Sequence, residues 1–305
     1  MSVLIIGYGS IGSRHADILS RFGSTVSIVT AQKIQFYARH DTIEEALEKN
    51  SFDKIIIANA THLHYVTLKK IISLNFQGTI LIEKPLFSQL EYPELKSHNN
   101  IYISYNLRFH PLLQYLRNLL QGDELVSFSV HAGSYLPDWR KNIVYQQCYS
   151  AKKESGGGVL RDLSHELDYI LWICGKCIEV TAIGGHFSAL EINSDDIYSI
   201  LMRCENCPII NVQIDYLSRT PIRKILIQTK KHRTILLDLI EGTLIVNGEV
   251  ELQVKNAIEQ TYTKQHELII QKNFTDMCDY LQGLAVMKLI TTIEKSARDK
   301  KWITL

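Results

Sequence analysis

The sequence predicts a two-part α/β protein in which a parallel sheet covered by helices precedes an open, mainly antiparallel sheet. Up to about residue 105, short apolar runs alternate with helical patterns, which is typical of a parallel sheet covered on both faces. After about residue 120, β-branched and apolar runs follow one another, separated by turn residues. The chain has 305 residues, 46% of them apolar, which is enough for two cores. We therefore expect one domain over residues 1–108 and a second over 109–305.

Three glycines near the start of the chain follow a short apolar strand at the spacing of a dinucleotide site. The strand covers residues 3–6, and Gly7, Gly9 and Gly12 come directly after it. Gly7 permits a tight turn, Gly9 lets the backbone approach a pyrophosphate, and Gly12 lets the next helix pack against the sheet. The N-terminus of that helix then faces the phosphates. This pattern predicts a Rossmann domain that binds a nicotinamide nucleotide through Gly7, Tyr8, Gly9, Ser10, Ile11 and Gly12.

The end of the second predicted strand, residues 25–29, bears on the choice of cofactor. An NAD enzyme usually presents an acidic residue here to the ribose hydroxyls, but this sequence has Thr30 and Lys33. A hydroxyl and an ammonium can bind a 2′-phosphate, which a carboxylate would repel. The sequence therefore favours NADP over NAD, unless Lys33 is only a solvated loop residue.

Polar residues follow the next predicted strand, residues 54–58, at the edge where doubly wound folds bind ligands. They are Asn59, Thr61 and His64, and His64 opens a helix. We predict all three as cofactor contacts. A capping or space-filling role is the alternative for His64, because a lone histidine is more often structural.

Glu83, Lys84 and Pro85 follow the predicted strand over residues 79–82. Pro85 restricts Lys84 to an extended conformation, which makes a rigid mount for an ammonium. Hydride transfer at a carbinol carbon needs a partner that moves the hydroxyl proton. We predict Lys84 as a catalytic residue, and Glu83 and Lys84 as cofactor contacts. A turn that only ends the strand is the alternative.

A second glycine cluster, residues 156–158, leads into a helical pattern that carries Asp162 and His165. Three residues apart on one helix, these two side chains share a face. An aspartate beside a histidine fixes the orientation of the ring and stabilises its cation, as a proton-handling pair requires. We predict both as catalytic residues, and a solvated polar helix face is the alternative.

Aromatic and basic residues between these motifs are candidate ligand contacts. Aromatic rings stack on sugar faces, and Arg or Lys binds phosphate or carboxylate. We expect Asn106 and Arg108 at the cofactor. The predicted substrate residues are Tyr135, Trp139, Arg140, Tyr149 and Lys152. Exposed tyrosines in a loop are equally compatible with a protein interface.

The remaining patterns supply the framework of the two domains. Residues 41–45 form a capping box before a short helix, and a helical stripe covers about 273–298. The predicted strands of the second domain cover residues 125–134, 178–187, 197–204, 209–217, 222–229, 233–238 and 243–247.

Charge, hydropathy and cysteine content limit the partners. Thirty-three basic and 32 acidic residues leave a net charge of +1, which indicates neither nucleic-acid nor membrane-surface binding. No apolar stretch is long enough to cross a bilayer, and the first strand begins too close to Met1 for a secretory signal, so we expect a cytoplasmic protein.

Two C-x-x-C pairs, Cys174/Cys177 and Cys204/Cys207, could hold zinc. Because a whole strand separates them, reduced thiols without metal are the preferred interpretation.

The order of these motifs resembles the Gfo/Idh/MocA family, named for glucose-fructose oxidoreductase, inositol dehydrogenase and a rhizopine-catabolism protein. The resemblance spans nearly the whole chain. It rests on the glycine fingerprint ending in His15, the Thr61-x-x-His64 step, residues 83–85, Asn106-x-Arg108-Phe109, and the glycines leading to Asp162 and His165. It implies an N-terminal Rossmann domain and a C-terminal α/β domain whose open sheet often makes dimers or tetramers.

The resemblance also implies roles for individual residues. Lys84 and His165 become the catalytic pair with Asp162 assisting, although the family usually spaces its aspartate and histidine four residues apart. The cofactor region is then lined by Gly7, Gly9, Gly12, His64 and Glu83. The stretch 133–140, with residues 149–152, is similar to a subgroup associated with bacterial surface-sugar metabolism.

Together these observations predict a cytoplasmic NAD(P)-dependent oxidoreductase. It is expected to move a hydride between nicotinamide and a hydroxyl-bearing or keto carbon of a sugar, a sugar derivative or a nucleotide-linked sugar. We expect Lys84 and His165 to converge on the same reactive ring, in a homodimer or homotetramer formed through the C-terminal sheet. The alternatives are a nicotinamide-assisted glycosidase or eliminase of the same fold, and a non-catalytic cofactor-sensing regulator.

Overall fold

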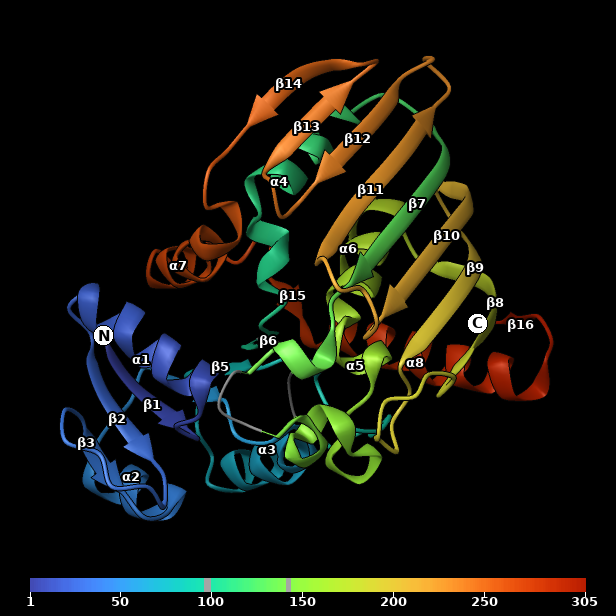
Figure 1. The fold of residues 1–305 in the computed structure, drawn as a ribbon. Coiled ribbons are helices and arrows are strands. Elements are labelled where there is room, and N and C mark those ends of the chain that lie inside the picture. Colours follow the sequence, from blue (N-terminus) through green and yellow to red (C-terminus); the bar gives the residue numbers. More distant parts are fainter. Residues whose placement is uncertain (96–99, 141–143) are drawn as a thin grey trace. The chain divides into compact units, whose positions relative to one another are not determined.

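The computed structural model describes residues 1–95, 100–140 and 144–305. Its backbone contacts divide the chain into two units, whose elements are labelled in Figure 1. Unit 1 comprises Met1–Asn106 and Tyr262–Leu284, and unit 2 comprises Leu107–Thr261 and Ala285–Leu305. The first boundary lies beside the one expected at residue 108. Residues 262–284 differ from the expected division, because they pack with unit 1.

Unit 1 is built on a seven-stranded sheet with the order β15-β6-β5-β4-β1-β2-β3. Neighbouring strands pair in parallel except β15, which is antiparallel to β6. An order that runs outward from β1 in both directions is typical of a doubly wound sheet, so the predicted Rossmann domain is confirmed. The strands are β1 Ser2–Ile6, β2 Thr25–Val29, β3 Ala38–His40, β4 Lys54–Ile57, β5 Thr79–Ile82, β6 Ile101–Ile103 and β15 Cys278–Asp279.

Helices α1 (Ser10–Arg21), α2 (Ile43–Lys49) and α3 (His64–Ser73) belong to unit 1. The predicted capping box before α2 is confirmed. Thr42 Oγ1 accepts a hydrogen bond from the Glu45 N–H at 3.1 Å, and the Glu45 carboxylate accepts one from the Asp41 N–H at 2.9 Å. A further helix, α7 (Ala257–Ile270), starts in unit 2 and contributes its later residues to unit 1.

Unit 2 is built on a nine-stranded sheet with the order β14-β13-β12-β11-β7-β10-β9-β8-β16. Strands β7 and β10 pair in parallel, and the other neighbouring pairs are antiparallel. The predicted open, mainly antiparallel sheet is therefore confirmed. The strands are β7 Leu125–Gly133, β8 Cys177–Gly185, β9 Ile197–Cys204, β10 Cys207–Asp215, β11 Ile222–Thr229, β12 Thr234–Asp238, β13 Thr243–Val246, β14 Glu249–Gln253 and β16 Ile303–Thr304.

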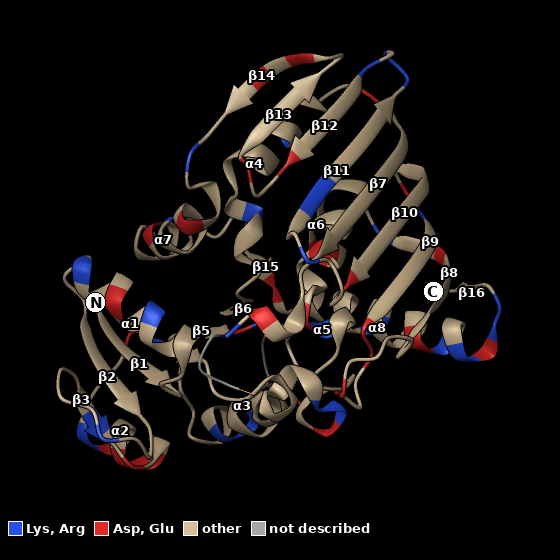
Figure 2. Cartoon of the chain, viewed as in Figure 1, with Lys and Arg blue, Asp and Glu red and all other residues tan. Residues whose placement is uncertain are grey.

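The central strands of this sheet have one buried and one exposed face. In β9, Tyr198, Ile200 and Met202 are buried, whereas Ser199 and Leu201 are exposed. This alternation puts one apolar row into the core. Helix α5 contacts the sheet at β9 and β10, and α6 contacts it at β7. The strands β7, β9 and β10 carry few charged side chains (Figure 2).

The helices of unit 2 correct two expectations. A single helix through residues 159–172 is wrong, because Leu163 leaves the helical conformation with φ −100° and ψ 28° and separates α5 from α6. The final helix does not begin near residue 273 but at Tyr280, where the Asp279 carboxylate accepts the Gln282 N–H at 2.8 Å and fixes the start. The bounds are α4 Pro111–Leu119, α5 Val159–Asp162, α6 Ser164–Cys174 and α8 Tyr280–Asp299, and 3₁₀ turns cover residues 61–63, 106–109, 136–138, 145–147, 149–151 and 153–155.

Candidate active site

Gly7, Gly9 and Gly12 form the turn between β1 and α1. Gly7 has φ +98°, and a Cβ there would lie 2.7 Å from the backbone of Asn59. A Cβ on Gly12 would lie 2.2 Å from the carbonyl oxygen of Gly7. A Cβ on Gly9 would meet no described atom within 4 Å. The fold therefore requires two of the glycines, whereas Gly9 leaves room for a ligand. The same turn contains Tyr8, Ser10 and Ile11.

The helix after this turn offers its N-terminus to an anion. Its N-cap is Gly9, and among the described residues no side chain caps its first turn, which has no acidic residue. Helix N–H groups favour a phosphate at such a position. Nearby, the Asn59 amide donates to Thr67 at 2.9 Å, while its buried Oδ1 has no hydrogen-bond partner within the described chain. Thr61 is also buried. These features fit a dinucleotide at the carboxyl edge of the sheet.

The end of β2 carries a second cation that the sequence analysis missed. Thr30 Oγ1 accepts the Gln32 N–H at 3.1 Å, and the Thr30 carbonyl accepts the Arg39 Nε–H at 3.0 Å. Arg39 belongs to the three-residue strand β3 and forms an ion pair with Asp41. A strand this short has too few residues to show a periodic pattern. The predicted Lys33 lies exposed in the loop between β2 and β3.

His64 opens α3, as predicted, and faces backbone carbonyl groups. Its Nδ1 lies 3.1 Å from the Pro85 oxygen and 3.2 Å from the Leu86 oxygen, and its Nε2 lies 3.1 Å from the Asn59 oxygen. Burial lowers the pKa of this imidazole, which favours the neutral form. His64 therefore lies between the loop after Lys84 and the end of β4, and its neutral form donates to one of the two. Its predicted contact with a cofactor stays a prediction.

Glu83 and Lys84 follow β5 at the carboxyl edge. The Glu83 carboxylate is buried and accepts hydrogen bonds from His15 Nε2 at 2.9 Å and from the Lys84 N–H at 3.3 Å. Burial raises the pKa of this carboxyl, but the hydrogen bond and charge of His15, with the Ser104 hydrogen bond and the Lys84 charge, outweigh burial and lower the pKa. Lys84 is half-buried. The motif thus places the ionised carboxylate of Glu83 and the backbone that carries the Lys84 side chain in one turn.

Asp162 is the centre of a hydrogen-bonded cluster in unit 2. The Tyr149 hydroxyl donates to its Oδ1 at 2.8 Å, and the Tyr216 hydroxyl donates to its Oδ2 at 2.6 Å. Burial and the adjacent carboxylate raise the pKa of both tyrosines well above its usual value, so both stay protonated donors. His165 is buried at the start of α6. The sequence analysis missed Tyr216, because its position after β10 has no local signature.

Three of the predicted substrate residues meet at this cluster. The Trp139 ring packs edge-on against Tyr216, with 5.2 Å between ring centroids. The Arg140 guanidinium lies 5.6 Å from the centroid of the Tyr149 ring. Lys152 is half-buried on the same loop. The structure therefore joins aromatic faces, a guanidinium and a carboxylate within unit 2.

Other predicted residues have different surroundings. The Tyr135 ring is covered by the Arg219 guanidinium, 3.6 Å from its centroid. Arg108 is buried and donates to both carboxylate oxygens of Asp168, at 2.9 Å and 2.7 Å. This bidentate ion pair holds the Arg108 guanidinium on Asp168 within unit 2. Asn106 is buried at the end of the first stretch of unit 1. Cofactor contacts from Asn106 and Arg108 stay predictions.

Lys84 belongs to unit 1, whereas His165 and Asp162 belong to unit 2. Each unit holds its own part of the predicted site in defined surroundings. The pairing of Lys84 with His165 at one reacting carbon stays a prediction.

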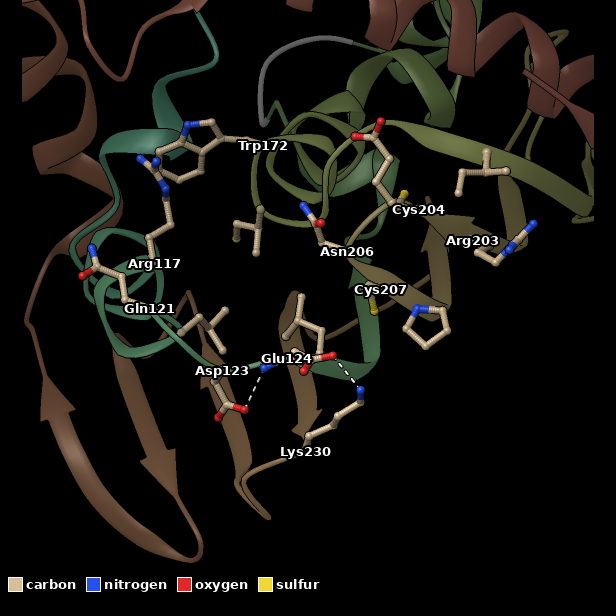
Figure 3. Close-up of a pocket in the computed structure, with 16 residues that line it drawn as sticks. Arg117, Gln121, Asp123, Glu124, Trp172, Arg203, Cys204, Asn206, Cys207 and Lys230 are labelled. Atoms are coloured by element: carbon tan, nitrogen blue, oxygen red, sulfur yellow. Dashed lines mark hydrogen bonds and ion pairs between the residues drawn. The ribbon is translucent and has the colours of Figure 1, made fainter.

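A cavity of about 610 Å³ has Trp172, near the end of α6, among its lining residues (Figure 3). The Arg117 guanidinium lies 4.1 Å from the centroid of the Trp172 ring on one side of it. On another side, Lys230 donates to the Glu124 carboxylate at 2.6 Å. Trp172 follows His165 by two helical turns, about 10 Å. The cavity is therefore remote from the predicted catalytic histidine.

The two C-x-x-C pairs meet beside this cavity. Cys177 lies opposite Cys204 in the β8–β9 pair, and thiol hydrogen bonds link Cys177 with Cys204 and Cys174 with Cys207. The intervening strand does not keep the pairs apart, because β8 and β9 run antiparallel. Over residues 1–95, 100–140 and 144–305, no group of three or more His, Cys, Asp or Glu side chains could hold a metal ion. That these are reduced thiols without metal stays a prediction.

None of the described helices is both long and apolar enough to span a bilayer.

A protein-family model matches the C-terminal part of the chain. Residues 114–232 match the model described as the GFO/IDH/MocA C-terminal domain. No curated protein matches the sequence significantly. The resemblance inferred from the motifs is therefore confirmed.

Solved structures share the fold. A myo-inositol dehydrogenase from Corynebacterium glutamicum has a TM-score of 0.79 at 18% identity, covering 100% of this chain and 98% of that chain. The WlbA dehydrogenase from Bordetella pertussis, in complex with NADH and UDP-GlcNAcA, has a TM-score of 0.78 at 15% identity, with 100% and 98% covered. A levoglucosan dehydrogenase in complex with NADH has a TM-score of 0.82 at 16% identity, with 100% and 98% covered. At these identities the likeness establishes the fold.

Proposed function

From the match of residues 114–232 to the GFO/IDH/MocA C-terminal domain, we propose that the chain is a member of the Gfo/Idh/MocA family and an NAD(P)-dependent oxidoreductase of a sugar or sugar derivative. The observation that carries the proposal is the turn at Gly9, an uncapped helix N-terminus with open space above it. Asn59 and Lys84 end neighbouring strands at the same edge, since Ile6, Ile57 and Ile82 are in register. Two strand spacings, about 10 Å, therefore separate the glycine turn from the mount of Lys84.

The residues of the chain supply proton handling. A nicotinamide dinucleotide would supply the hydride acceptor or donor when bound. The Lys84 amine or the His165 imidazole takes a proton from the substrate hydroxyl during oxidation and returns it during reduction. Asp162 acts as a positioning residue. Both of its carboxylate oxygens accept hydrogen bonds from tyrosine hydroxyls, which hold its side chain in place. It fixes the start of the segment that carries His165.

The surroundings of Thr30 support NADP as the cofactor. A 2′-phosphate prefers cationic donors, and an arginine near the end of the second strand is the usual solution. Arg39 meets the Thr30 carbonyl, and Lys33 lies in the adjoining loop. The other predicted cofactor contacts fit a dinucleotide of either kind. We therefore propose NADP, with NAD as the competing cofactor.

The cluster around Asp162 supports a sugar carrying an anionic group as the substrate. Trp139 and Tyr149 offer aromatic faces to a sugar ring, and the Arg140 guanidinium suits a phosphate or carboxylate. A nucleotide-linked sugar has both features. The WlbA structure contains such a molecule, UDP-GlcNAcA.

The exposed face of the nine-stranded sheet supports a homodimer or homotetramer. Leu201, Ile209 and Leu226 are exposed on β9, β10 and β11. Exposed apolar side chains on a sheet face with few charges are typical of a protein interface. The protein is proposed to work in the cytoplasm on a small-molecule substrate, and its net charge of +1 favours neither nucleic acid nor a membrane surface.

The experiment is a screen of sugars and nucleotide sugars with NADP⁺ and NAD⁺, followed by absorbance at 340 nm. The proposal predicts a net rise in absorbance with at least one sugar, and a stronger response with NADP⁺. Conversion of substrate without net absorbance change would instead indicate a glycosidase or eliminase that regenerates its cofactor. Cofactor binding without conversion of any substrate would indicate a sensing protein. Either result would overturn the proposal.

A further inference from the structure

A row of four buried polar side chains crosses one face of the sheet in unit 1. Lys54 Nζ lies 3.2 Å from His266 Nδ1, His266 Nε2 lies 2.7 Å from His15 Nδ1, and His15 Nε2 lies 2.9 Å from Glu83 Oε1. Glu83 is 6% exposed, and the other three are at most 1% exposed. Lys54 begins β4 opposite Thr79, so the row spans roughly 13 Å along the strands to Glu83.

Proton counting restricts this row to few arrangements. An ionised Glu83 only accepts, so His15 carries a proton on Nε2. In one arrangement Lys54 is an ammonium that donates to His266 Nδ1, and His266 Nε2–H donates to His15 Nδ1. In the other, one proton has moved from Lys54 to His266 and one from His266 to His15. Lys54 is then a neutral amine that accepts from His266, and His15 is an imidazolium beside Glu83.

The environment allows the second arrangement near neutral pH. Burial lowers the pKa of Lys54 to about 7. Burial, together with the charges of Lys54 and His15, lowers the pKa of His266 well below its usual value. His266 is therefore a neutral relay between two groups that can carry the charge. The summed charge of the row, including Glu83, is zero in both arrangements.

Within the part of the chain that the structure describes, the neighbouring elements add no second anion to the row. Tyr262 from α7 packs edge-on against His15, with 5.7 Å between ring centroids, and the Arg14 guanidinium lies 5.1 Å from the Tyr262 ring. Ser104, after β6, donates to Glu83 and accepts the Gln265 side-chain N–H at 3.0 Å. His64 on α3 and Lys84 also face Glu83 electrostatically. Among the described residues of the row and its neighbours, Glu83 is therefore the group that carries a negative charge near pH 7.

We propose that Lys54, His266 and His15 are positioning residues that hold Glu83 as a carboxylate and, through it, the backbone N–H of Lys84. Glu83 Oε2 accepts this N–H at 3.3 Å. The inference rests on the proposed catalytic role of Lys84. It assigns a function to three residues that are at most 1% exposed, and two of them, Lys54 and His266, lie outside every motif of the sequence.

The test compares Lys54→Met, His266→Leu and His266→Gln by the pH profile of kcat/KM. Met and Leu remove the source or the relay of the positive charge, so Glu83 should take up a proton at higher pH. We expect roughly tenfold loss of kcat/KM at pH 6.5, where most Glu83 carboxyls would be protonated, and less than twofold loss at pH 8.5. Above the pKa of the carboxyl, its protonated fraction falls about tenfold for each pH unit. Glutamine offers one acceptor to the Lys54 ammonium and one donor to His15 but cannot pass a proton, so His266→Gln should lose less kcat/KM at pH 6.5 than His266→Leu.

A second readout does not depend on activity. Nitrogen NMR of histidine-labelled protein, with the His15 signals assigned by a His15→Asn variant, should show Nε2 of His15 protonated. Its Nδ1 shift should change in Lys54→Met while circular dichroism stays the same. Unchanged His15 signals and an unchanged pH profile in Lys54→Met would overturn the inference. Full turnover in Lys84→Met would overturn the proposed function itself. Loss of turnover in Lys84→Met together with a wild-type profile in Lys54→Met would overturn the inference and leave the proposed function in place.

Discussion

Two buried carboxylates, Glu83 in unit 1 and Asp162 in unit 2, have opposite kinds of hydrogen-bond donors. Glu83 accepts from His15, whose ring continues through His266 to Lys54. Asp162 accepts from two tyrosine hydroxyls whose pKa is raised by burial. The first carboxylate is therefore joined through two imidazole rings to Lys54, whose pKa of about 7 lets it gain or lose a proton near neutral pH. The second has tyrosine donors whose raised pKa keeps them protonated near neutral pH.

This difference separates the pH response of the protein from its substrate-binding framework. Protonation should change the surroundings of Lys84 in unit 1, while the Asp162 cluster keeps its geometry. A buried anion with neutral donors is a fixed support, whereas one joined to imidazoles is adjustable. The following variants test that contrast.

The largest effect is expected from Asp162→Ala, which leaves the buried hydroxyl of Tyr216 and the partly buried hydroxyl of Tyr149 without their acceptor. The free energy of unfolding should fall by about 3 kcal/mol, since each unsatisfied group costs about 1–3 kcal/mol. All three tryptophans, Trp139, Trp172 and Trp302, lie in unit 2, so urea unfolding followed by tryptophan fluorescence reports this unit.

Asp162→Asn is the matched control for that variant. It keeps one carbonyl acceptor and should cost only about 1 kcal/mol. The loss in both variants should be the same at pH 6 and pH 8. Equal losses in Ala and Asn, or a loss that varies over this range, would contradict the fixed-support interpretation.

A smaller effect is expected from the pH dependence of stability that Lys54 contributes. Its pKa falls from 10.5 in the unfolded chain to about 7 in the fold, so the folded state binds fewer protons between these values. The free energy of unfolding should therefore rise with pH through this window, and the stabilisation is lost as pH falls toward 7. Between pH 7.5 and 9.5 the contribution is about 2 kcal/mol. Urea unfolding by circular dichroism should show this rise in the wild type and a flatter curve in Lys54→Met; identical slopes would refute it.

A third variant, Gly9→Ala, separates cofactor binding from folding within unit 1. Its Cβ enters space that is open in the fold, so melting temperature should stay unchanged while the Kd for NADPH rises roughly tenfold, about 1.4 kcal/mol. Gly12→Ala is the contrasting variant, because its Cβ would overlap the Gly7 carbonyl oxygen and lower the melting temperature. Fluorescence titration with NADPH measures the first effect. Undiminished affinity in Gly9→Ala would place the phosphates elsewhere.

The smallest effect is expected from Arg39→Ala, which removes the guanidinium beside Thr30. The KM for NADP should rise about fivefold, about 1 kcal/mol, while the KM for NAD stays constant. Lys33→Ala is the matched control for the second predicted cation. Equal changes for both cofactors in Arg39→Ala would show that Arg39 does not distinguish them.

Local pattern predicted the parts of the site that neighbouring residues build. The glycine turn, the capping box at residues 41–45 and the strand before Glu83 depend on short segments, and each lies where the sequence indicates. The break at Leu163 was not predictable from helical periodicity. It leaves the apolar stripe intact on both sides while changing one residue's backbone.

The parts built by distant segments escaped prediction. His266 lies 251 residues from its partner His15, and Tyr216 lies 54 residues from Asp162. Hydrogen bonds between such residues have no periodicity to reveal them, and a buried lysine at the start of a strand has the same sequence signal as an exposed one. Arg39 escaped for a related reason, because its strand is three residues long.

The most direct test of the account is the turnover of Lys84→Met with a substrate from the screen. The account predicts that kcat falls by about 10²–10⁴, a larger factor than any rise in the Kd for NADPH measured by fluorescence. Lys295→Met, at an exposed position of α8, should match the wild type in both. Wild-type turnover in Lys84→Met would contradict the account, because Lys84 would then handle no proton.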